Sequence, residues 1–275
     1  MRVLVTGGSG TLGSNIIRWL NADPNIKKII SISRSESNLN RVPSGPKVEK
    51  LLADICNKDS LAGIGLIDRV FHCAALKHVD LGEQYPYEFY RVNVEGTRNL
   101  LRTFYGSEFR FCTTDKAVKP INVYGCTKQI AERMVLNCYN GHVFRWGNVV
   151  GSNGSAIPFF ARQIAAGKSV PITDKNMTRF WLTIERAVEF MCDTTVKAGD
   201  NLTLIPTILK AAPVLAILDA IADILDKPYE IHEIGLRPGE KIHEDMSETL
   251  NSNNAPKFTH RELVTLIKPV VEVSV

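Results

Sequence analysis

The sequence predicts an α/β protein built on a doubly wound parallel sheet, with a smaller C-terminal lobe. Up to about residue 150, short β-branched strands alternate with segments of helical period, which is typical of a parallel sheet covered by helices. Beyond that point the strict alternation is lost. We therefore expect a first domain at residues 1–150 and a second lobe at residues 151–275, interleaved with the last sheet elements.

Composition excludes several classes of protein. The chain has 275 residues, of which 44% are hydrophobic and 23% charged, as in ordinary soluble globular proteins. Its net charge of +4 is spread along the chain, so we expect no nucleic-acid partner, whereas a small anionic substrate fits. No apolar run approaches the roughly 20 residues of a bilayer span, and Met1 leads directly into a strand. A cytoplasmic protein without a membrane partner is expected.

Cysteines and histidines give no sign of a metal site. The six cysteines form no C-x-x-C pair, and the six histidines lack metal-ligand spacing. We expect reduced thiols and no metal.

The first unit is a strand at residues 2–6, a glycine turn at 7–13 and a helix at 14–20. Glycines at positions 7, 10 and 13 allow a tight turn and close backbone approach, which let a pyrophosphate sit on the helix N-terminus. Such turns often only connect elements, but the position between a strand and a helix favours a dinucleotide site. The predicted cofactor contacts here are Gly7, Ser9, Gly10, Thr11, Leu12 and Gly13.

The second strand, residues 28–33, ends where an NAD-binding fold normally places an acidic residue for the ribose 2′-hydroxyl. Ser33 and Arg34 stand there instead, and a hydroxyl with a guanidinium would accept a 2′-phosphate. The sequence therefore favours NADP over NAD. A solvated surface Arg34 is the alternative, and the nearby Glu36 is an objection to the phosphate interpretation.

The elements that follow continue the alternation of strands and helices. We expect a polar loop at 35–47, strands at 48–52 and 69–73, a helix at 87–105 with a solvated Asn93, a strand at 109–112, a helix at 124–139 and a strand at 141–146. Ligands bind beyond the carboxyl ends of such strands. Further cofactor contacts are accordingly predicted at Asp54, Ile55, Ala74, Ala75 and Lys77.

After residue 152 the predicted elements are a helix at 157–166, a Thr/Pro-containing segment at 170–182, a helix from residue 183, a helix at 215–225 and a charged turn at 237–241.

Residues 113–128 carry the groups suited to proton transfer. Tyr124 and Lys128 have the i, i+4 spacing that places two side chains on one helix face. A phenol with a pKa near 10 needs a neighbouring positive charge to act as a base near neutrality, and Lys128 is placed to supply it. Asp115 and Lys116 add an acid and an amine. An exposed ion pair is the alternative, but the position after a strand and before Tyr-x-x-x-Lys favours catalysis.

These motifs resemble a known group of proteins. The glycine triplet with Tyr124-x-x-x-Lys128 resembles the extended short-chain dehydrogenase/reductases, which include nucleotide-sugar epimerases and dehydratases. Five longer stretches resemble the inverting UDP-N-acetylglucosamine 4,6-dehydratases (5-epimerases) of the polysaccharide-biosynthesis group, namely residues 74–78, 113–124, 145–149, 177–180 and 237–244. The similarity runs from Met1 to about Glu244.

The resemblance implies an NADP-binding domain of Rossmann type at residues 1–150 and a substrate-binding lobe at 151–275. It implies that Lys77, Tyr124 and Lys128 contact NADP. The implied UDP-sugar contacts are Lys77, Thr114, Asn148, Val149, Arg179, Arg237 and Glu240. It also implies a homo-oligomer, because helices like those at 87–105 and 124–139 pair across subunits in this superfamily.

The expected reaction is loss of water from the sugar through transient NADP reduction. Tyr124 takes the C4 hydroxyl proton, Thr114 hydrogen-bonds the ketone, and Asp115 protonates the departing C6 hydroxyl if its pKa is raised. Lys116 removes the C5 proton if burial or neighbouring charge lowers its pKa. The alternatives are a retaining dehydratase, in which an acidic residue stands in place of Lys116, a UDP-sugar 4-epimerase, and a non-catalytic NADP-sensing protein.

Overall fold

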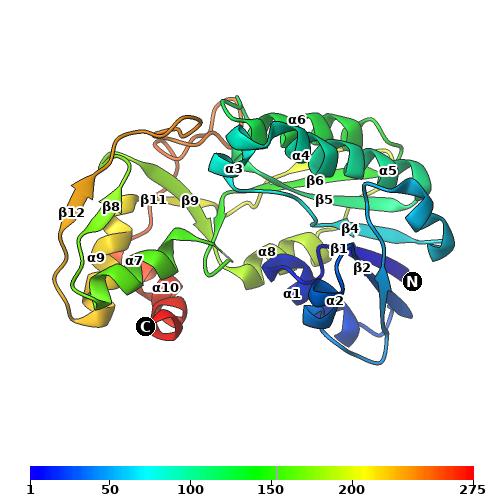
Figure 1. Ribbon diagram of the computed structural model, residues 1–275, viewed down its shortest axis with the longest axis horizontal. Coiled ribbons are helices and arrows are strands. Elements are labelled where there is room, and N and C mark those ends of the chain that lie inside the picture. The colour runs from blue at the N-terminus through cyan, green and yellow to red at the C-terminus, as the bar shows by residue number, and fades with distance from the viewer. Residues whose placement is uncertain (153) are drawn as a thin grey trace.

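A seven-stranded sheet forms the centre of the larger lobe in the computed structural model, which describes residues 1–152 and 154–275 (Figure 1). All neighbouring strands are parallel, in the order β10-β6-β5-β4-β1-β2-β3. The strands are β1 Arg2–Thr6, β2 Lys28–Ser33, β3 Val48–Leu52, β4 Arg69–His72, β5 Glu108–Thr114, β6 Gly141–Trp146 and β10 Thr203–Leu204. The strand order reverses between β1 and β4, which confirms the predicted doubly wound α/β fold and defines the switch point where ligands bind.

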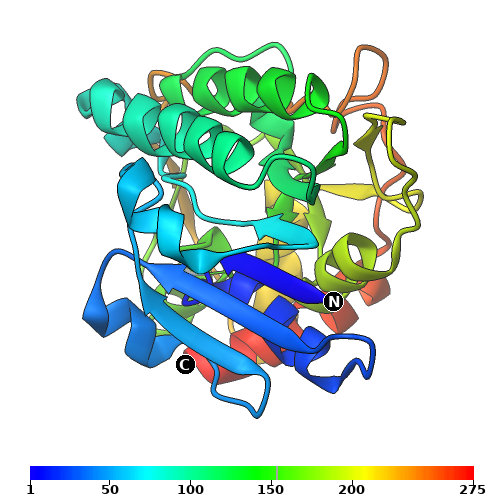
Figure 2. The ribbon, with the colours of Figure 1, turned by 90° about the vertical axis from the view of Figure 1, so that its right-hand side faces the viewer.

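Helices cover both faces of this sheet (Figures 1 and 2). One face carries α3 Val79–Gln84, α4 Pro86–Tyr90, α5 Gly96–Thr103 and α6 Val123–Leu136, and the other carries α1 Thr11–Ala22, α2 Glu36–Arg41 and α8 Ile184–Asp193. Each face has its own apolar core: Phe109 and Phe111 pack towards α5 and α6, and Phe71 and Phe144 towards α1 and α8. Burial on both faces explains why the central strand β1 is almost continuously hydrophobic.

Two predicted elements differ from the structure. The polar loop expected at 35–47 contains the short helix α2, which begins because the Ser35 hydroxyl accepts a hydrogen bond from the Asn38 N–H. None of its residues is buried, so hydrophobic periodicity could not reveal it. The helix expected at 87–105 is divided into α4, a π-helical turn at Arg91–Glu95, and α5. Asn93 lies inside that turn and is buried, so the interpretation of Asn93 as a merely solvated residue does not apply.

A second, smaller lobe lies next to the larger one (Figure 1). It contains a three-stranded sheet, β7 Asn148–Val149, β9 Thr178–Leu182 and β11 Lys210–Pro213, and a two-stranded sheet, β8 Val170–Ile172 and β12 Ile231–Glu233. Helices α7 Ala156–Ala165, α9 Val214–Leu225 and α10 His260–Ser274 pack around an apolar core that includes Ile157, Ile217 and Ile267. A capping box formed by Thr259 and Glu262 begins α10.

Two elements from the second half of the chain belong to the larger lobe. Helix α8 packs on α1, and β10 pairs with β6 at the edge of the central sheet. The buried Arg110 of β5 donates hydrogen bonds to the carbonyls of Met191, Cys192 and Thr194, which satisfies the C-terminal end of α8. The lobes are therefore interleaved in sequence, and a domain boundary near residue 150 stays a prediction. Over residues 1–152 and 154–275, no helix has the length and apolarity needed to cross a membrane.

Candidate active site

A cavity of about 260 Å³ opens at the carboxyl ends of β1, β2, β3 and β4. Its lining includes many of the residues predicted to contact a cofactor: Gly7, Ser9, Gly10, Ser33, Arg34, Asp54, Ile55, Ala74 and Ala75. Thr11, Leu12 and Gly13 form the adjoining first turn of α1, whereas Lys77 follows β4 further along the same edge. The fold thus brings four separate strand ends to one crevice.

The glycine turn has no room for side chains. Gly7 has a φ of 70°, and a Cβ there would lie 2.8 Å from the backbone nitrogen of Ala74. A Cβ on Gly13 would collide with the carbonyl oxygen of Gly7. Gly10 begins α1, and no side chain among the described residues caps it, so the N–H groups of the first turn face the crevice. These features fit the pyrophosphate of a dinucleotide.

Arg34 lies at the rim of the cavity with Ser33 and Asn38. Glu36 is exposed in the first turn of α2 and is not part of the lining, which weakens the objection that it raised to a 2′-phosphate. Arg91 approaches the same end, with its guanidinium 4.0 Å from Asp54 and 2.9 Å from Glu88. At this end of the cavity, Arg34 and Asp54 belong to the lining, and Arg91 lies near Asp54 while paired with Glu88.

A buried hydrogen-bond chain connects the glycine-turn strand to the helices opposite. Thr6 Oγ1 accepts from the Ala74 N–H and donates to His72 Nδ1, and His72 Nε2 lies 2.9 Å from Thr97 Oγ1. Asn93 accepts from the Leu76 N–H and donates to the Leu76 carbonyl, both at 2.9 Å. The π-helical turn therefore aims Asn93 at the segment that forms one wall of the cavity.

Thr114, Asp115 and Lys116 stand at the end of β5. Thr114 is the last residue of the strand, and the 3₁₀ turn Asp115–Ala117 follows. Thr114 Oγ1 donates to Asp115 Oδ1 at 2.9 Å, while Asp115 Oδ2 is buried without a hydrogen-bond partner in the described part of the chain. Burial raises the pKa of Asp115, Glu244 raises it further, and Lys116 partly opposes them. A raised carboxyl pKa is what a general acid requires.

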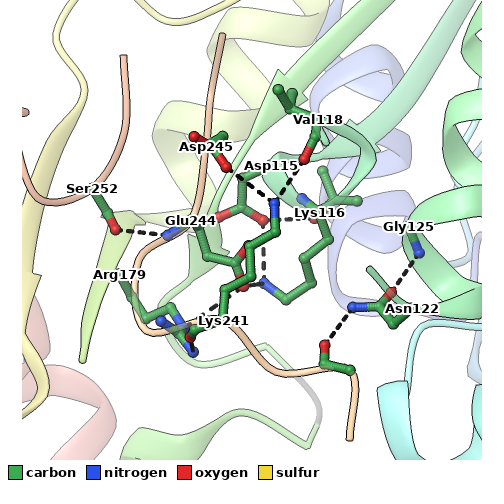
Figure 3. A network of polar contacts seen from close by, with 12 residues as sticks. Asp115, Lys116, Val118, Asn122, Gly125, Arg179, Lys241, Glu244, Asp245 and Ser252 are labelled. Carbon is green, nitrogen blue, oxygen red and sulfur yellow. Dashed lines mark hydrogen bonds and ion pairs between the residues drawn. The ribbon is translucent and has the colours of Figure 1, made fainter. Parts of the chain in front are cut away.

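Lys116 lies between two carboxylates (Figure 3). Its Nζ is 3.2 Å from Asp115 Oδ1 and 3.2 Å from Glu244 Oε1. Burial alone would lower the pKa of Lys116, but the two carboxylates outweigh it and raise the pKa above its ordinary value. The lowered pKa that was set as the condition for a base is therefore not found in this structure, because Glu244 supplies a second negative charge that the local sequence did not indicate.

Tyr124 and Lys128 both lie on α6, which Asn122 caps by accepting a hydrogen bond from the Gly125 N–H. The Lys128 amine donates to the Cys112 carbonyl at 2.7 Å and lies 3.9 Å from the centre of the Phe111 ring. Burial, as the largest cause, raises the pKa of Tyr124 above its ordinary value. The expected lowering by Lys128 is not found in this structure.

Besides Lys77 after β4 and Thr114 at the end of β5, the predicted substrate residues come from three places. Asn148 and Val149 form β7, Arg179 lies on β9, and Arg237 and Glu240 lie in the segment after β12. Arg179 is buried and donates hydrogen bonds to the carbonyls of Thr178, Lys241 and Ile242, so it holds that segment in place. One oxygen of Glu240 is buried without a hydrogen-bond partner among residues 1–152 and 154–275. Arg237 is exposed.

Residues 237–245, here called the docking loop, contact Lys116 and the segment that leads from the 3₁₀ turn into α6 (Figure 3). Asn122 donates to the Gly239 carbonyl at 2.7 Å, and Lys241 Nζ donates to the Val118 carbonyl at 2.9 Å. Lys241 also lies 3.1 Å from Asp245. Glu244, the last residue of the charged motif in this loop, was not predicted as a site residue. Its place at the end of that motif was the only signal.

The fold and the site together define an extended short-chain dehydrogenase/reductase. Residues 3–266 match the model of the family described as "Polysaccharide biosynthesis protein", and the chain belongs to that family. It is 34% identical to an inverting UDP-N-acetylglucosamine 4,6-dehydratase of Campylobacter jejuni, over 93% of this chain and 80% of the relative.

Two further proteins are similar to this chain, one in sequence and one in structure. A UDP-glucose 4-epimerase of Rickettsia massiliae is 32% identical over 89% of this chain and 76% of its own. The crystal structure of Pen from Bacillus thuringiensis superposes with a TM-score of 0.85 at 27% identity, covering 96% of each chain.

Proposed function

We propose that this protein is an NADP-dependent, inverting UDP-N-acetylglucosamine 4,6-dehydratase, a lyase that forms a UDP-4-keto-6-deoxy-hexosamine. The observation that carries the proposal is the pair formed by the buried Asp115 and the partly buried Lys116, 3.2 Å apart at the end of β5 and followed by Tyr124 on α6. The 34% identity to an inverting dehydratase supports the choice of substrate and stereochemistry. The glycine turn and its cavity support a nicotinamide dinucleotide.

When bound, the dinucleotide would supply the hydride acceptor for C4 and the hydride returned to C6. Gly7, Gly10 and the first turn of α1 would hold its pyrophosphate, and Ser33 with Arg34 would hold the 2′-phosphate. Tyr124 accepts the proton of the C4 hydroxyl. Because burial raises the pKa of Tyr124, this step requires positive charge near the phenol, which Lys128 and a bound oxidised nicotinamide would supply.

The elimination needs a base at C5 and an acid at C6 in the same complex. At rest the proton is on Lys116, between Asp115 and Glu244. Transfer of that proton across the 3.2 Å from Lys116 Nζ to Asp115 Oδ1 produces a neutral amine and a protonated carboxyl together. The raised pKa of Asp115 favours this transfer, whereas the raised pKa of Lys116 opposes it. Lys116 can then remove the C5 proton, Asp115 can protonate the leaving C6 hydroxyl, and Thr114 can hydrogen-bond the C4 ketone.

Product analysis tests this proposal. Purified protein is incubated with NADP and UDP-N-acetylglucosamine in deuterated water, and the product is examined by mass spectrometry and NMR. We expect a 4-keto-6-deoxy sugar with deuterium at C5 and inverted configuration there. A product with retained configuration would assign the chain to the retaining dehydratases, and a C4 epimer without loss of water would favour the epimerase alternative that the Rickettsia relative raises. Absence of any product would favour the NADP-sensing alternative.

The Lys116→Ala variant tests the assignment of the base. It should bind NADP and the sugar nucleotide as the wild type does, because those contacts lie elsewhere, yet lose about 10²–10⁴-fold in kcat, the usual contribution of a general base. An active variant within a few-fold of wild type would show that the amine serves only as an ion-pair partner for Asp115.

A further inference from the structure

The 3₁₀ turn Asp115–Ala117 is called the catalytic turn below. Glu244 is a third charged group at this turn, although it comes from the docking loop of the second lobe. Its Oε1 lies 3.2 Å from Lys116 Nζ and 4.0 Å from Arg179 Nε. Its side chain is only 3% exposed, and its second oxygen is buried without a hydrogen-bond partner among the described residues. A carboxylate held so far from water is stable only if its partners compensate the lost hydration.

The backbone around Glu244 is fixed to the second lobe. The Glu244 N–H donates to Ser252 Oγ at 2.9 Å, and the Ser252 N–H donates to the Glu244 carbonyl at 2.8 Å. Ser252 Oγ in turn donates to the carbonyl of Thr178 on β9 at 3.0 Å. Arg179, the next residue of β9, donates to the carbonyls of Lys241 and Ile242. Hydrogen bonds to Ser252 and Arg179 therefore hold the backbone from which Glu244 reaches Lys116.

The charges that face Glu244 come from three elements. The catalytic turn contributes Lys116 and Asp115, β9 contributes Arg179, and the docking loop contributes Lys241, which is paired with Asp245. Burial would raise the pKa of Glu244, but Lys116 and then Arg179 outweigh it, so the pKa lies below its ordinary value. Glu244 is accordingly ionised at neutral pH. His243, beside it, points instead to the Thr178 hydroxyl at 2.8 Å.

We propose that Glu244 is a positioning residue for the reaction: it holds the Lys116 amine beside Asp115 and sets the pH range over which this pair can exchange its proton. The inference rests on the proposed function. A lysine side chain has many rotamers, and one carboxylate at 3.2 Å does not fix its amine as well as two on different elements do. Because Glu244 is negative, it also opposes the loss of a proton from either member of the pair.

The pH dependence of kcat distinguishes this role from a purely structural ion pair. In Glu244→Gln, which keeps the shape and removes the charge, protons leave the pair more easily. Both limbs of the kcat profile should then move to lower pH by about one unit or more, since a close charge shifts pKa values by roughly 1–3. Glu244→Asp keeps the charge on a shorter side chain, so its limbs should stay at the wild-type positions while kcat falls. Asp245→Asn, which removes a neighbouring carboxylate that pairs with Lys241, should leave the profile unchanged.

A second measurement does not depend on activity. In protein labelled with ¹³C at the lysine ε-carbons, the Lys116 signal is identified by its absence in Lys116→Arg. Its titration should move to lower pH in Glu244→Gln and stay unchanged in Asp245→Asn. If the wild type dehydrates the sugar while Glu244→Gln, folded by circular dichroism, shows wild-type limbs and a wild-type Lys116 titration, the inference is wrong. If the wild type produces no keto-sugar, the proposed function fails, and the titration still decides whether Glu244 controls Lys116.

Discussion

Lys116 illustrates how much a residue's chemistry depends on partners that are distant in sequence. Asp115 and Thr114 could be placed beside it from the sequence, because they are its neighbours at the end of one strand. Glu244 could not, because only the packing of the docking loop against the 3₁₀ turn brings it within 3.2 Å. For that reason the structure does not show the lowered pKa that the base role of Lys116 was said to require, whereas it shows the raised pKa that an acid role of Asp115 requires.

Arg34 decides between the two dinucleotides in our prediction. It lines the cavity beside Ser33, where a 2′-phosphate would accept charge-assisted hydrogen bonds. We expect the wild type to bind NADP more tightly than NAD and Arg34→Asp to reverse the order, since a carboxylate accepts from a ribose hydroxyl and repels a phosphate. Fluorescence titration with both cofactors measures this. Equal affinities in the wild type would contradict it, and Arg41→Asp, at the last residue of α2 and outside the lining, serves as control.

His72 makes the free energy of unfolding decrease as the pH becomes acidic. Burial, with a smaller contribution from the charge of Lys128, lowers its pKa from 6.5 to about 3. Stability from this group is therefore fully present above 6.5 and is lost as the pH falls towards 3, because the unfolded chain then binds a proton that the native protein excludes. At 1.36 kcal/mol per pH unit, the loss amounts to at most about 5 kcal/mol.

The matching variant is His72→Gln, which keeps polar atoms in the chain from Thr6 to Thr97 but cannot titrate near these pH values. Urea unfolding at a series of pH values should show a shallower decline of the free energy of unfolding between about pH 6 and about pH 4 than in the wild type. Parallel declines in the two proteins would mean that other groups cause the acid sensitivity.

At the scale of elements, the spacing of apolar residues predicted most strands and the long helices. The strands and helices pack on apolar cores on both faces of the central sheet, so their apolar residues recur with the period of each element. It did not locate α2, whose start depends on a cap, or the π-helical turn, whose sequence continues the pattern of the helices around it. The turn has a clear role: it directs Asn93 at both backbone groups of Leu76, in the wall of the cavity.

Replacing Asn93 tests that role. Asn93→Ala leaves the Leu76 N–H and carbonyl without their partner in a partly buried site, which should destabilise the fold by about 1–3 kcal/mol. The residues that line the cavity on either side should become less ordered, so the affinity for NADP should fall as well. Urea unfolding and cofactor titration give the two values. Unchanged cofactor affinity in a destabilised variant would show that Asn93 supports the fold alone.

For the whole molecule, we predict association of several copies. Large side chains on the outer helices of the sheet remain exposed, with Tyr87 at 69%, Tyr90 at 41% and Ile130 at 45%. These residues lie on α4 and α6, within the two helical segments for which pairing across subunits was expected. Light scattering should return a mass above the 30.5 kDa of one chain. Tyr87→Glu should lower it, since a charge on this face opposes burial; a monomeric wild type would refute the prediction.

The return of α8 and β10 to the larger lobe has a consequence for how such a protein can change. A single recombination near residue 150 with the gene of a related enzyme would not exchange one intact lobe for another, because α8 and β10 belong to the larger lobe. That crossover would give the sheet a foreign edge strand and would replace the backbone carbonyls that Arg110 binds at the end of α8. A laboratory chimera therefore needs breakpoints that leave residues 184–204 with the N-terminal half.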